Sequence, residues 1–335
     1  MKSEIPANFF PRRGSSPGVN RREALWLLGT CSVGAPIAAA FSPARAQAVS
    51  MPRDPAEIDE GHFNPCGMPR EAKKFTGPFA VRNATYIVSS SNQAHDLPLR
   101  ILLPDKLEEI DSPKVLYALP TEPEIGVTTG DALLTIEQQN LHNKHGLIVV
   151  APSFSDWPWY ADHPTKPEIR QETYFVEEIV PFIDGLYPKA SQKRLLLGFS
   201  KSGNGSCQLL LRHPELFHAA SIYDAPLMCN AACQFGMADI YGDQNNFDKY
   251  CIPQLLRKQT DLLRGKPPRL ALFGYCMFGG PNPLYGPHIE EAHALMGNLG
   301  IPHIYDDSAC RDHRWDSGWL EPAVAALEKM SQPKL

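Results

Sequence analysis

The chain has 335 residues, of which 43% are hydrophobic and 21% charged, and its formal net charge is −5. These proportions are those of an ordinary globular protein. The weakly acidic balance does not suggest a nucleic-acid partner, which would normally need a basic face, and we expect none. After the first fifty residues, no segment approaches the roughly 20 apolar residues of a membrane span.

Residues 1–48 predict an export signal. The pair Arg21-Arg22 directly precedes an apolar run that ends at Phe41, and residues 44–48 offer Ala-x-Ala cleavage sites. A charged start, an apolar middle and small residues at the end are typical of a secretory signal. The paired arginines favour twin-arginine export. A membrane anchor is the alternative, but the run is short and rich in Gly, Pro and Ala. We therefore expect a periplasmic or secreted protein that meets the export machinery and is not stably inserted in a membrane after signal removal.

Strand and helix patterns alternate along the rest of the chain. Residues 49–81 have no clear period and indicate an extended leader, followed by one catalytic domain over residues 82–332. Apolar runs predict strands at residues 83–90, 97–103, 114–119, 146–151, 193–198, 218–223, 269–273 and 302–305. Helical spacing predicts helices at residues 131–143, 168–186, 202–213, 289–299 and 319–330, with residues 226–266 irregular or helical. We expect an α/β fold, with an antiparallel opening hairpin and then a mostly parallel sheet covered by helices on both faces.

The segment Gly198-Phe199-Ser200-Lys201-Ser202-Gly203 predicts a nucleophile elbow at Ser200. The serine stands between a predicted strand and a predicted helix, which is the context of that motif. Small neighbours let the tight turn close. The common pattern is Gly-x-Ser-x-Gly, whereas here Ser202 occupies the fifth position and glycine follows one residue later. An N-cap serine is the alternative interpretation.

A serine hydroxyl needs a base within hydrogen-bond reach. In this kind of fold the triad follows the order serine, acid, histidine, so the base should follow the last strand. His288 opens a helix, His293 lies within it and His303 lies in a strand. Only His313 stands in a loop before the closing helix. We therefore predict His313 as the base, held by the neighbouring tryptophans.

The acid is harder to place, because residues 274–287, where it would usually lie, contain no Asp or Glu. Asp224 ends the preceding predicted strand, and side chains there point into the crevice where open α/β sheets bind ligands. A turn residue before Pro226 is the alternative interpretation of Asp224. We rank Asp224 first and Glu290 second, and leave Asp306, Asp307 or no acid as the remaining alternatives.

An acyl transfer also needs hydrogen-bond donors for the oxyanion. The backbone N–H of Lys201 supplies one, and Thr121 or Glu122, after a predicted strand, supplies the other because proline has no N–H. Aromatic residues follow another strand at the same edge. They predict a substrate-binding surface for a sugar or an aromatic acid, and the alternative is a loop pinned by its own aromatics. These residues are Trp157, Trp159 and Tyr160.

Metal and cofactor motifs are weak in this sequence. Cys229 and Cys233 have i, i+4 spacing and Asp162 precedes His163, but further ligands are not placed nearby. No dinucleotide or phosphate-binding glycine pattern is present. We expect neither a metal nor another cofactor. Seven cysteines follow the signal, so in an oxidising compartment at least one thiol stays unpaired.

The sequence resembles the esterase branch of the α/β-hydrolases, which includes esterase D, feruloyl esterases and mycolyl-transferases. The resemblance covers about residues 83–330. It rests on the elbow at Ser200, on residues 174–187 and 212–217, and on His313-Arg314-Trp315. It implies a Ser-His-acid triad, hydrolysis of a carboxylic ester from a small molecule or glycan, and no cofactor. An acyltransferase with the same triad and a non-catalytic binding protein on the same fold are the alternatives, because the fold alone does not fix the function.

Overall fold

The computed structural model describes residues 84–190, 193–274, 276–277, 280–281, 286–309 and 311–332. The predicted export signal, the leader and the first two residues of the predicted domain lie outside these ranges. Within the described ranges, no helix is both long enough and apolar enough to cross a membrane.

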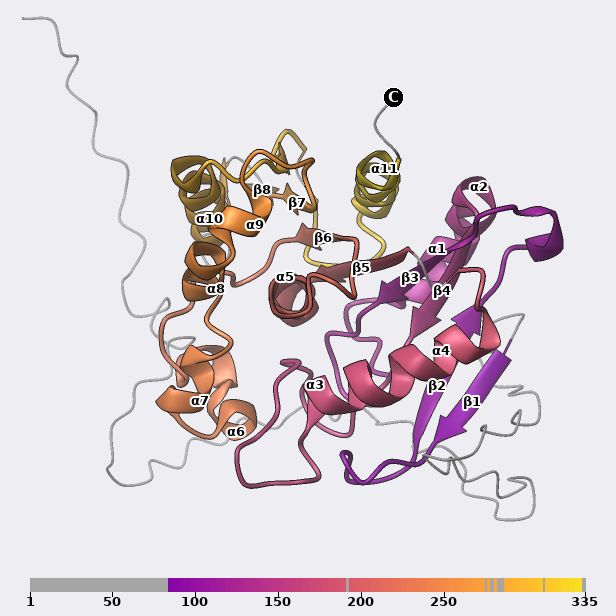
Figure 1. Cartoon of the computed structure of the whole chain (residues 1–335), viewed down its shortest axis with the longest axis horizontal. Coiled ribbons are helices and arrows are strands. Elements are labelled where there is room, and N and C mark those ends of the chain that lie inside the picture. The colour runs from indigo at the N-terminus through magenta and orange to yellow at the C-terminus, as the bar shows by residue number, and fades with distance from the viewer. Residues whose placement is uncertain are drawn as a thin grey trace, which may run out of the picture.

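An eight-stranded sheet forms the centre of the fold (Figure 1). In chain order its strands are β1 (Ala84–Val88), β2 (Leu97–Leu102), β3 (Lys114–Ala118), β4 (Leu147–Ala151), β5 (Arg194–Phe199), β6 (Ala219–Tyr223), β7 (Leu270–Phe273) and β10 (Ile304–Asp306). Their spatial order is β1-β2-β4-β3-β5-β6-β7-β10. The pairings β1–β2 and β2–β4 are antiparallel, and those from β4 to β10 are parallel. A separate two-stranded ribbon joins β8 (Cys276–Met277) to β9 (Gly280–Pro281).

The helices cover both faces of the sheet. One face carries α3 (Gln171–Thr173), the π-helical η3 (Tyr174–Ile179), α4 (Val180–Leu186), α5 (Ser200–Arg212), α8 (Ile252–Lys258) and α10 (Gly286–Leu299). The other carries α1 (Ala132–Gln138), α2 (Leu141–His145) and α11 (Leu320–Ser331). Figure 1 shows α5 against the middle of the sheet and α11 on the opposite side. The predicted doubly covered, mostly parallel sheet is therefore confirmed.

Residues along β3 and just beyond it show why the sheet separates two cores. Val115, Tyr117 and Leu119 belong to the cluster under α5, whereas Leu116 and Ala118 belong to the cluster under α11. Successive side chains of a strand point to opposite faces, so a strand buried on both sides is a continuous apolar run. This is the run from which the strand is predicted.

A third apolar cluster lies away from the sheet and involves the chain between β6 and β7. The short helices there are η4 (Gln234–Gly236), α6 (Ala238–Tyr241), α7 (Gln244–Asp248) and α9 (Thr260–Leu263); another short helix, η2 (Leu107–Glu109), precedes β3. The cluster includes Trp159, Met237, Tyr241 and Phe247. The loop after β4 is thus packed against the segment after β6.

Two predicted helices differ from the structure. The helix predicted over residues 131–143 divides into α1 and α2, because Asn140 takes a left-handed φ of 55°. Asparagine adopts that conformation more readily than most residues. The helix predicted over residues 168–186 contains the π-helical η3, and Pro181 stands in the first turn of α4, where a missing N–H is tolerated.

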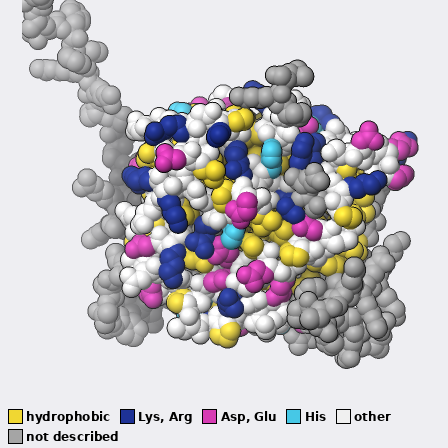
Figure 2. Space-filling view, viewed as in Figure 1, with side chains coloured by type: hydrophobic (Ala, Val, Ile, Leu, Met, Phe, Trp, Pro, Cys, Tyr) yellow, Lys and Arg dark blue, Asp and Glu magenta, His cyan; other side chains and the backbone are white. Residues whose placement is uncertain are grey.

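Positive and negative side chains are interspersed on the face seen in Figure 2, without a broad area of one sign. Because β3 to β10 run parallel, the segments that follow β3, β5 and β6 emerge at one edge of the sheet. The candidate site lies at this edge.

Candidate active site

Ser200 stands on a strained turn between β5 and α5. Its φ is 52°, in the left-handed region that residues other than glycine seldom adopt. Its backbone N–H donates to the carbonyl of Asp224 at 3.1 Å. Ser200 keeps 6% of its surface exposed, so its side chain is not sealed in the core. The turn has the conformation of a nucleophile elbow.

The residues around Ser200 explain the departure from the common motif. A Cβ on Gly198 would lie 2.3 Å from the Ser202 carbonyl oxygen, and one on Gly203 would lie 2.6 Å from Cβ of Ala225. Both glycines are therefore required for close approach. The Ser202 hydroxyl donates to the Phe199 carbonyl at 2.9 Å and accepts from the Phe199 N–H at 3.1 Å. Serine in the fifth motif position thus ties the elbow together instead of obstructing it.

Asp224 follows β6 and is fully buried, with a φ of 40°. Its Oδ2 lies 2.5 Å from Nδ1 of His313. A carboxylate accepts hydrogen bonds, so Nδ1 is the donor and Nε2 of the neutral ring is left as an acceptor. Glu290, the second-ranked acid, is exposed on α10. The structure therefore brings the first-ranked acid to the predicted base.

The loop that carries His313 is held by aromatic contacts. The Phe199 ring lies 4.9 Å from the His313 ring and 4.9 Å from the Trp315 ring, edge to face in both cases. The Tyr223 hydroxyl donates to the carbonyl of Asp312 at 2.9 Å. Phe199 and Tyr223 end β5 and β6, so the sheet itself fixes the histidine. The predicted tryptophans pack this loop through Phe199 and Arg314, whereas sequence reasoning missed Phe199 and Tyr223, which are ordinary core residues by pattern.

The predicted oxyanion donors are available. In the described residues, no acceptor is bonded to the backbone N–H of Thr121, Glu122 or Lys201. Thr121 and Glu122 are buried after β3. The Glu122 carboxylate accepts from the N–H of Thr128 at 3.0 Å and from its hydroxyl, while the hydroxyls of Thr121 and Thr129 are 3.2 Å apart. Glu122 therefore braces its own loop, which explains an acidic residue at this position.

The three predicted substrate-binding aromatics have different positions. Trp157 is 48% exposed, whereas Trp159 and Tyr160 are 1% and 0% exposed. The Tyr160 hydroxyl donates to the carbonyl of Pro120 at 2.6 Å, and Gln171 Oε1 accepts from the N–H groups of Trp159 and Tyr160. The prediction of a stacking surface is therefore wrong for Trp159 and Tyr160, which pack inward and hold the loop. Only Trp157 offers a ring face.

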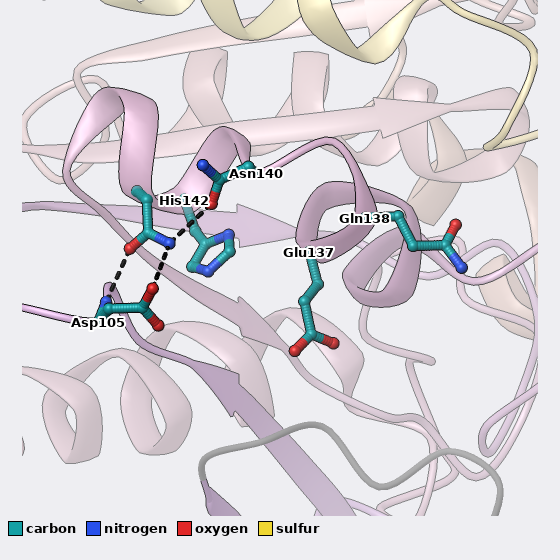
Figure 3. Close-up of a pocket in the computed structure, with 6 residues that line it drawn as sticks. Asp105, Glu137, Gln138, Asn140 and His142 are labelled. Atoms are coloured by element: carbon teal, nitrogen blue, oxygen red, sulfur yellow. Dashed lines mark hydrogen bonds between the residues drawn. The ribbon is translucent and has the colours of Figure 1, made fainter.

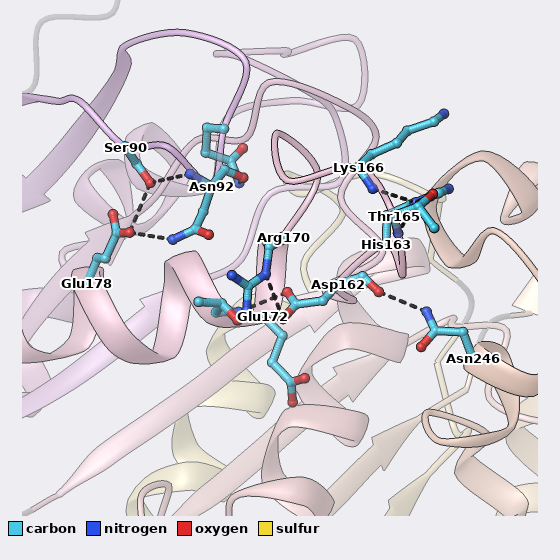
Figure 4. A network of polar contacts seen from close by, with 12 residues as sticks. Ser90, Asn92, Asp162, His163, Thr165, Lys166, Arg170, Glu172, Glu178 and Asn246 are labelled. Atoms are coloured by element: carbon cyan, nitrogen blue, oxygen red, sulfur yellow. Dashed lines mark hydrogen bonds and ion pairs between the residues drawn. The ribbon is translucent and has the colours of Figure 1, made fainter.

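Asp162 and His163 belong to a structural network (Figure 4). The Asp162 carboxylate accepts from the N–H of Thr173 at 3.0 Å, and its carbonyl accepts from Asn246 at 2.8 Å. His163 Nδ1 accepts from the N–H of Thr165 at 3.1 Å. Burial, followed by the charge of nearby Lys166, lowers the pKa of His163. Among the side chains that the structure describes, no group of three His, Cys, Asp or Glu is placed to hold a metal ion.

A polar cavity of about 260 Å³ lies away from these residues, beside α1 and α2 (Figure 3). Asn143 bridges it, donating to Asp105 Oδ2 at 2.9 Å and to Asn140 Oδ1 at 2.7 Å. Half of its six lining residues are thus bonded to one another, and Ser200 and His313 are not among them. We do not assign it to the candidate site.

The sheet order, the elbow at Ser200 and the Asp224–His313 contact define an α/β-hydrolase. Residues 90–237 match the model of the family described as "Putative esterase". That match includes Ser200 and Asp224 and ends before His313.

Comparison with known proteins gives the same fold. The mouse S-formylglutathione hydrolase is 24% identical over 153 residues, which cover 37% of this chain and 54% of the relative. The chain thus spans about half the length of this curated relative. A ferulic acid esterase structure is 19% identical with a TM-score of 0.56, and covers 74% of this chain and 97% of its own. FphF of Staphylococcus aureus, described as a fluorophosphonate-binding serine hydrolase, is 17% identical with a TM-score of 0.57, and covers 74% and 98%. The fold is therefore that of the α/β-hydrolases, and residues 90–237 are similar to an esterase family.

Proposed function

We propose that this protein hydrolyses carboxylic esters through an acyl-enzyme on Ser200, with His313 as the base and Asp224 as the acid. The observation that carries the proposal is the hydrogen-bonded Asp224–His313 pair beside a serine on a strained elbow. The esterase family match and the esterase relative support the class of reaction.

In the acylation step, Nε2 of His313 takes the proton of the Ser200 hydroxyl as its oxygen attacks the ester carbonyl. Asp224 holds the Nδ1–H tautomer and stabilises the imidazolium that forms. The burial of Asp224 keeps this contact out of water. The protonated ring then gives its proton to the leaving alcohol as the tetrahedral intermediate collapses.

The intermediate carries a negative oxygen, which needs donors that are already in place. The free N–H groups of Lys201 and of Thr121 or Glu122 fit this role, because each lies at the end of a neighbouring parallel strand. Lys201 also stands in the first turn of α5, where the helix dipole favours negative charge. Water then repeats the attack on the acyl-enzyme with His313 again as base, and the free acid is released.

Ser200→Ala should abolish ester hydrolysis by the full chain. Loss of the nucleophile removes the acyl-enzyme route, and we expect kcat for p-nitrophenyl acetate to fall by about 10,000-fold or more. Labelling by a fluorophosphonate, which reacts with activated serines, should disappear in the same variant. Thermal melting serves as the control for folding. A wild-type chain that neither turns over short-chain esters nor labels at Ser200 would contradict the proposal.

We also propose that the chain is exported through the twin-arginine route, on the basis of Arg21-Arg22 and the apolar run that follows. Changing both arginines to lysine keeps the charge but removes the pair that the route recognises. We expect the double variant to accumulate in the cytoplasm, measured by fractionation after pulse labelling. Unchanged export of the variant would exclude this route.

A further inference from the structure

The side chain of Lys201 has an unusual environment directly beside the nucleophile. Its Nζ lies 4.6 Å from the centroid of the Trp157 ring and 5.8 Å from that of the Trp159 ring. No hydrogen-bond acceptor and no ion-pair partner for this ammonium occurs among the residues that the structure describes. The side chain is half-buried, and its ammonium carries three N–H donors.

This arrangement leaves a cation with incomplete solvation. Burial lowers the pKa of Lys201, and the charge of Glu122 opposes that shift. The Glu122 carboxylate is itself bonded to the N–H and the hydroxyl of Thr128. A ring face attracts a cation but does not replace the hydrogen bonds that an ammonium makes in water. An anion on the substrate would restore them.

Trp157 adds a flat apolar surface next to this charge. It is the one exposed aromatic among the described side chains, at 48%. Its loop is already fixed, because its carbonyl accepts from the Gln171 amide at 3.0 Å and from the N–H of Trp159 at 3.0 Å. A preformed aromatic surface beside a cation suits an aromatic group that carries a negative charge.

We propose that Lys201 and Trp157 form a specificity subsite that selects aryl esters bearing a carboxylate. The proposal rests on the ester-hydrolase function proposed above. The Lys201 ammonium binds the carboxylate, and the Trp157 ring packs on the aryl group. Lys201 therefore contributes twice, through its backbone N–H to the oxyanion and through its side chain to the choice of substrate.

The test compares 4-acetoxybenzoate with its neutral isostere 4-acetoxybenzamide, in wild type, Lys201→Met and Lys201→Arg. Both variants keep the backbone N–H. We expect wild type to have the higher kcat/KM for the carboxylate. A hydrogen bond to a charged group is worth enough to change the carboxylate-to-amide ratio by about 10- to 100-fold, so Lys201→Met should lower it by that factor, mainly through KM. Lys201→Arg should retain the preference, and salt should weaken it.

Binding to the Ser200→Ala protein separates the subsite from the chemistry. Calorimetry should find 4-hydroxybenzoate bound more tightly than 4-hydroxybenzamide, and the difference should vanish when Lys201→Met is added. Trp157→Ala should weaken both aryl ligands alike. If wild type hydrolyses no ester but this binding difference is present, the proposed function fails and the subsite stands. Equal binding of the two ligands, or a ratio unchanged by Lys201→Met, would overturn the subsite.

Discussion

Replacing Asp224 with Asn should lower kcat for ester hydrolysis by about 10,000-fold, with little change in melting temperature. The asparagine amide has nearly the same shape as the carboxylate that lies 2.5 Å from His313 Nδ1. It cannot stabilise an imidazolium, and its NH₂ group favours the tautomer in which Nε2 carries the proton. The ring then has no lone pair for the Ser200 hydroxyl. Steady-state kinetics with p-nitrophenyl acetate measures the loss.

Glu290→Gln is the matched control, because Glu290 is the other acid that the sequence suggests. It is exposed on α10, and we expect full activity in this variant. If Glu290→Gln lost activity and Asp224→Asn kept it, the proposed assignment of the acid would be wrong.

Glu172→Gln should lower the free energy of unfolding by about 3 kcal/mol, the largest stability effect that we expect. Glu172 is 7% exposed and joins three parts of the fold. It accepts two hydrogen bonds from Arg212 at 2.6 and 2.8 Å, one from Tyr250 at 2.9 Å, and lies 2.7 Å from Nε2 of His213. The amide removes the negative charge that faces the Arg212 guanidinium, which keeps only its contacts with the Lys249 carbonyl and the Tyr250 ring.

The loss of unfolding free energy in Glu172→Gln should depend on pH in a defined direction. Burial alone would raise the pKa of Glu172, but hydrogen bonds from His213 and Arg212 outweigh it and lower the pKa from 4.5 to about 2. A carboxylate with a lowered pKa stabilises the folded state fully above its unfolded pKa, and the contribution disappears as pH falls through the folded pKa. The difference between wild type and Glu172→Gln should therefore be constant above about pH 4.5 and shrink toward pH 2.

Urea unfolding at several pH values measures this difference. Glu215→Gln is the control, since Glu215 lies 4.0 Å from the other nitrogen of His213 but its side chain is 75% exposed. We expect it to change the unfolding free energy by less than about 0.5 kcal/mol. Equal effects of the two substitutions would show that burial of Glu172 is not what matters.

The centre of the sheet could be predicted from the sequence because strands such as β3, β4 and β7 are apolar runs buried on both faces. The runs ending at Leu119, Ala151 and Phe273 are of this kind, and β3, β4 and β7 lie within them. The positions at which helices are interrupted were harder to predict from the sequence. Asn140 sits in an otherwise regular helical pattern, and only its left-handed conformation divides α1 from α2. Local spacing does not encode such a choice.

In the site, chain order and loop position were enough to propose His313, and Asp224 lies beside Ser200 because β6 is next to β5 in the sheet. The sequence did not predict which aromatic residues of the site face solvent. Trp157 and Trp159 are two residues apart in a loop without regular period, yet one is exposed and the other buried. The difference arises from packing against the segment after β6, a long-range contact.

The backbone conformations of Ser200 and Asp224 have a consequence for the stability of the fold. Ser200 and Asp224 both adopt left-handed φ values, and each such conformation costs on the order of 1 kcal/mol for a residue with a Cβ. Glycine at position 200 would relieve the cost there and remove the hydroxyl of the proposed nucleophile. We therefore expect Ser200→Gly to stabilise the fold slightly while it removes the proposed nucleophile, which would be a trade of stability for function.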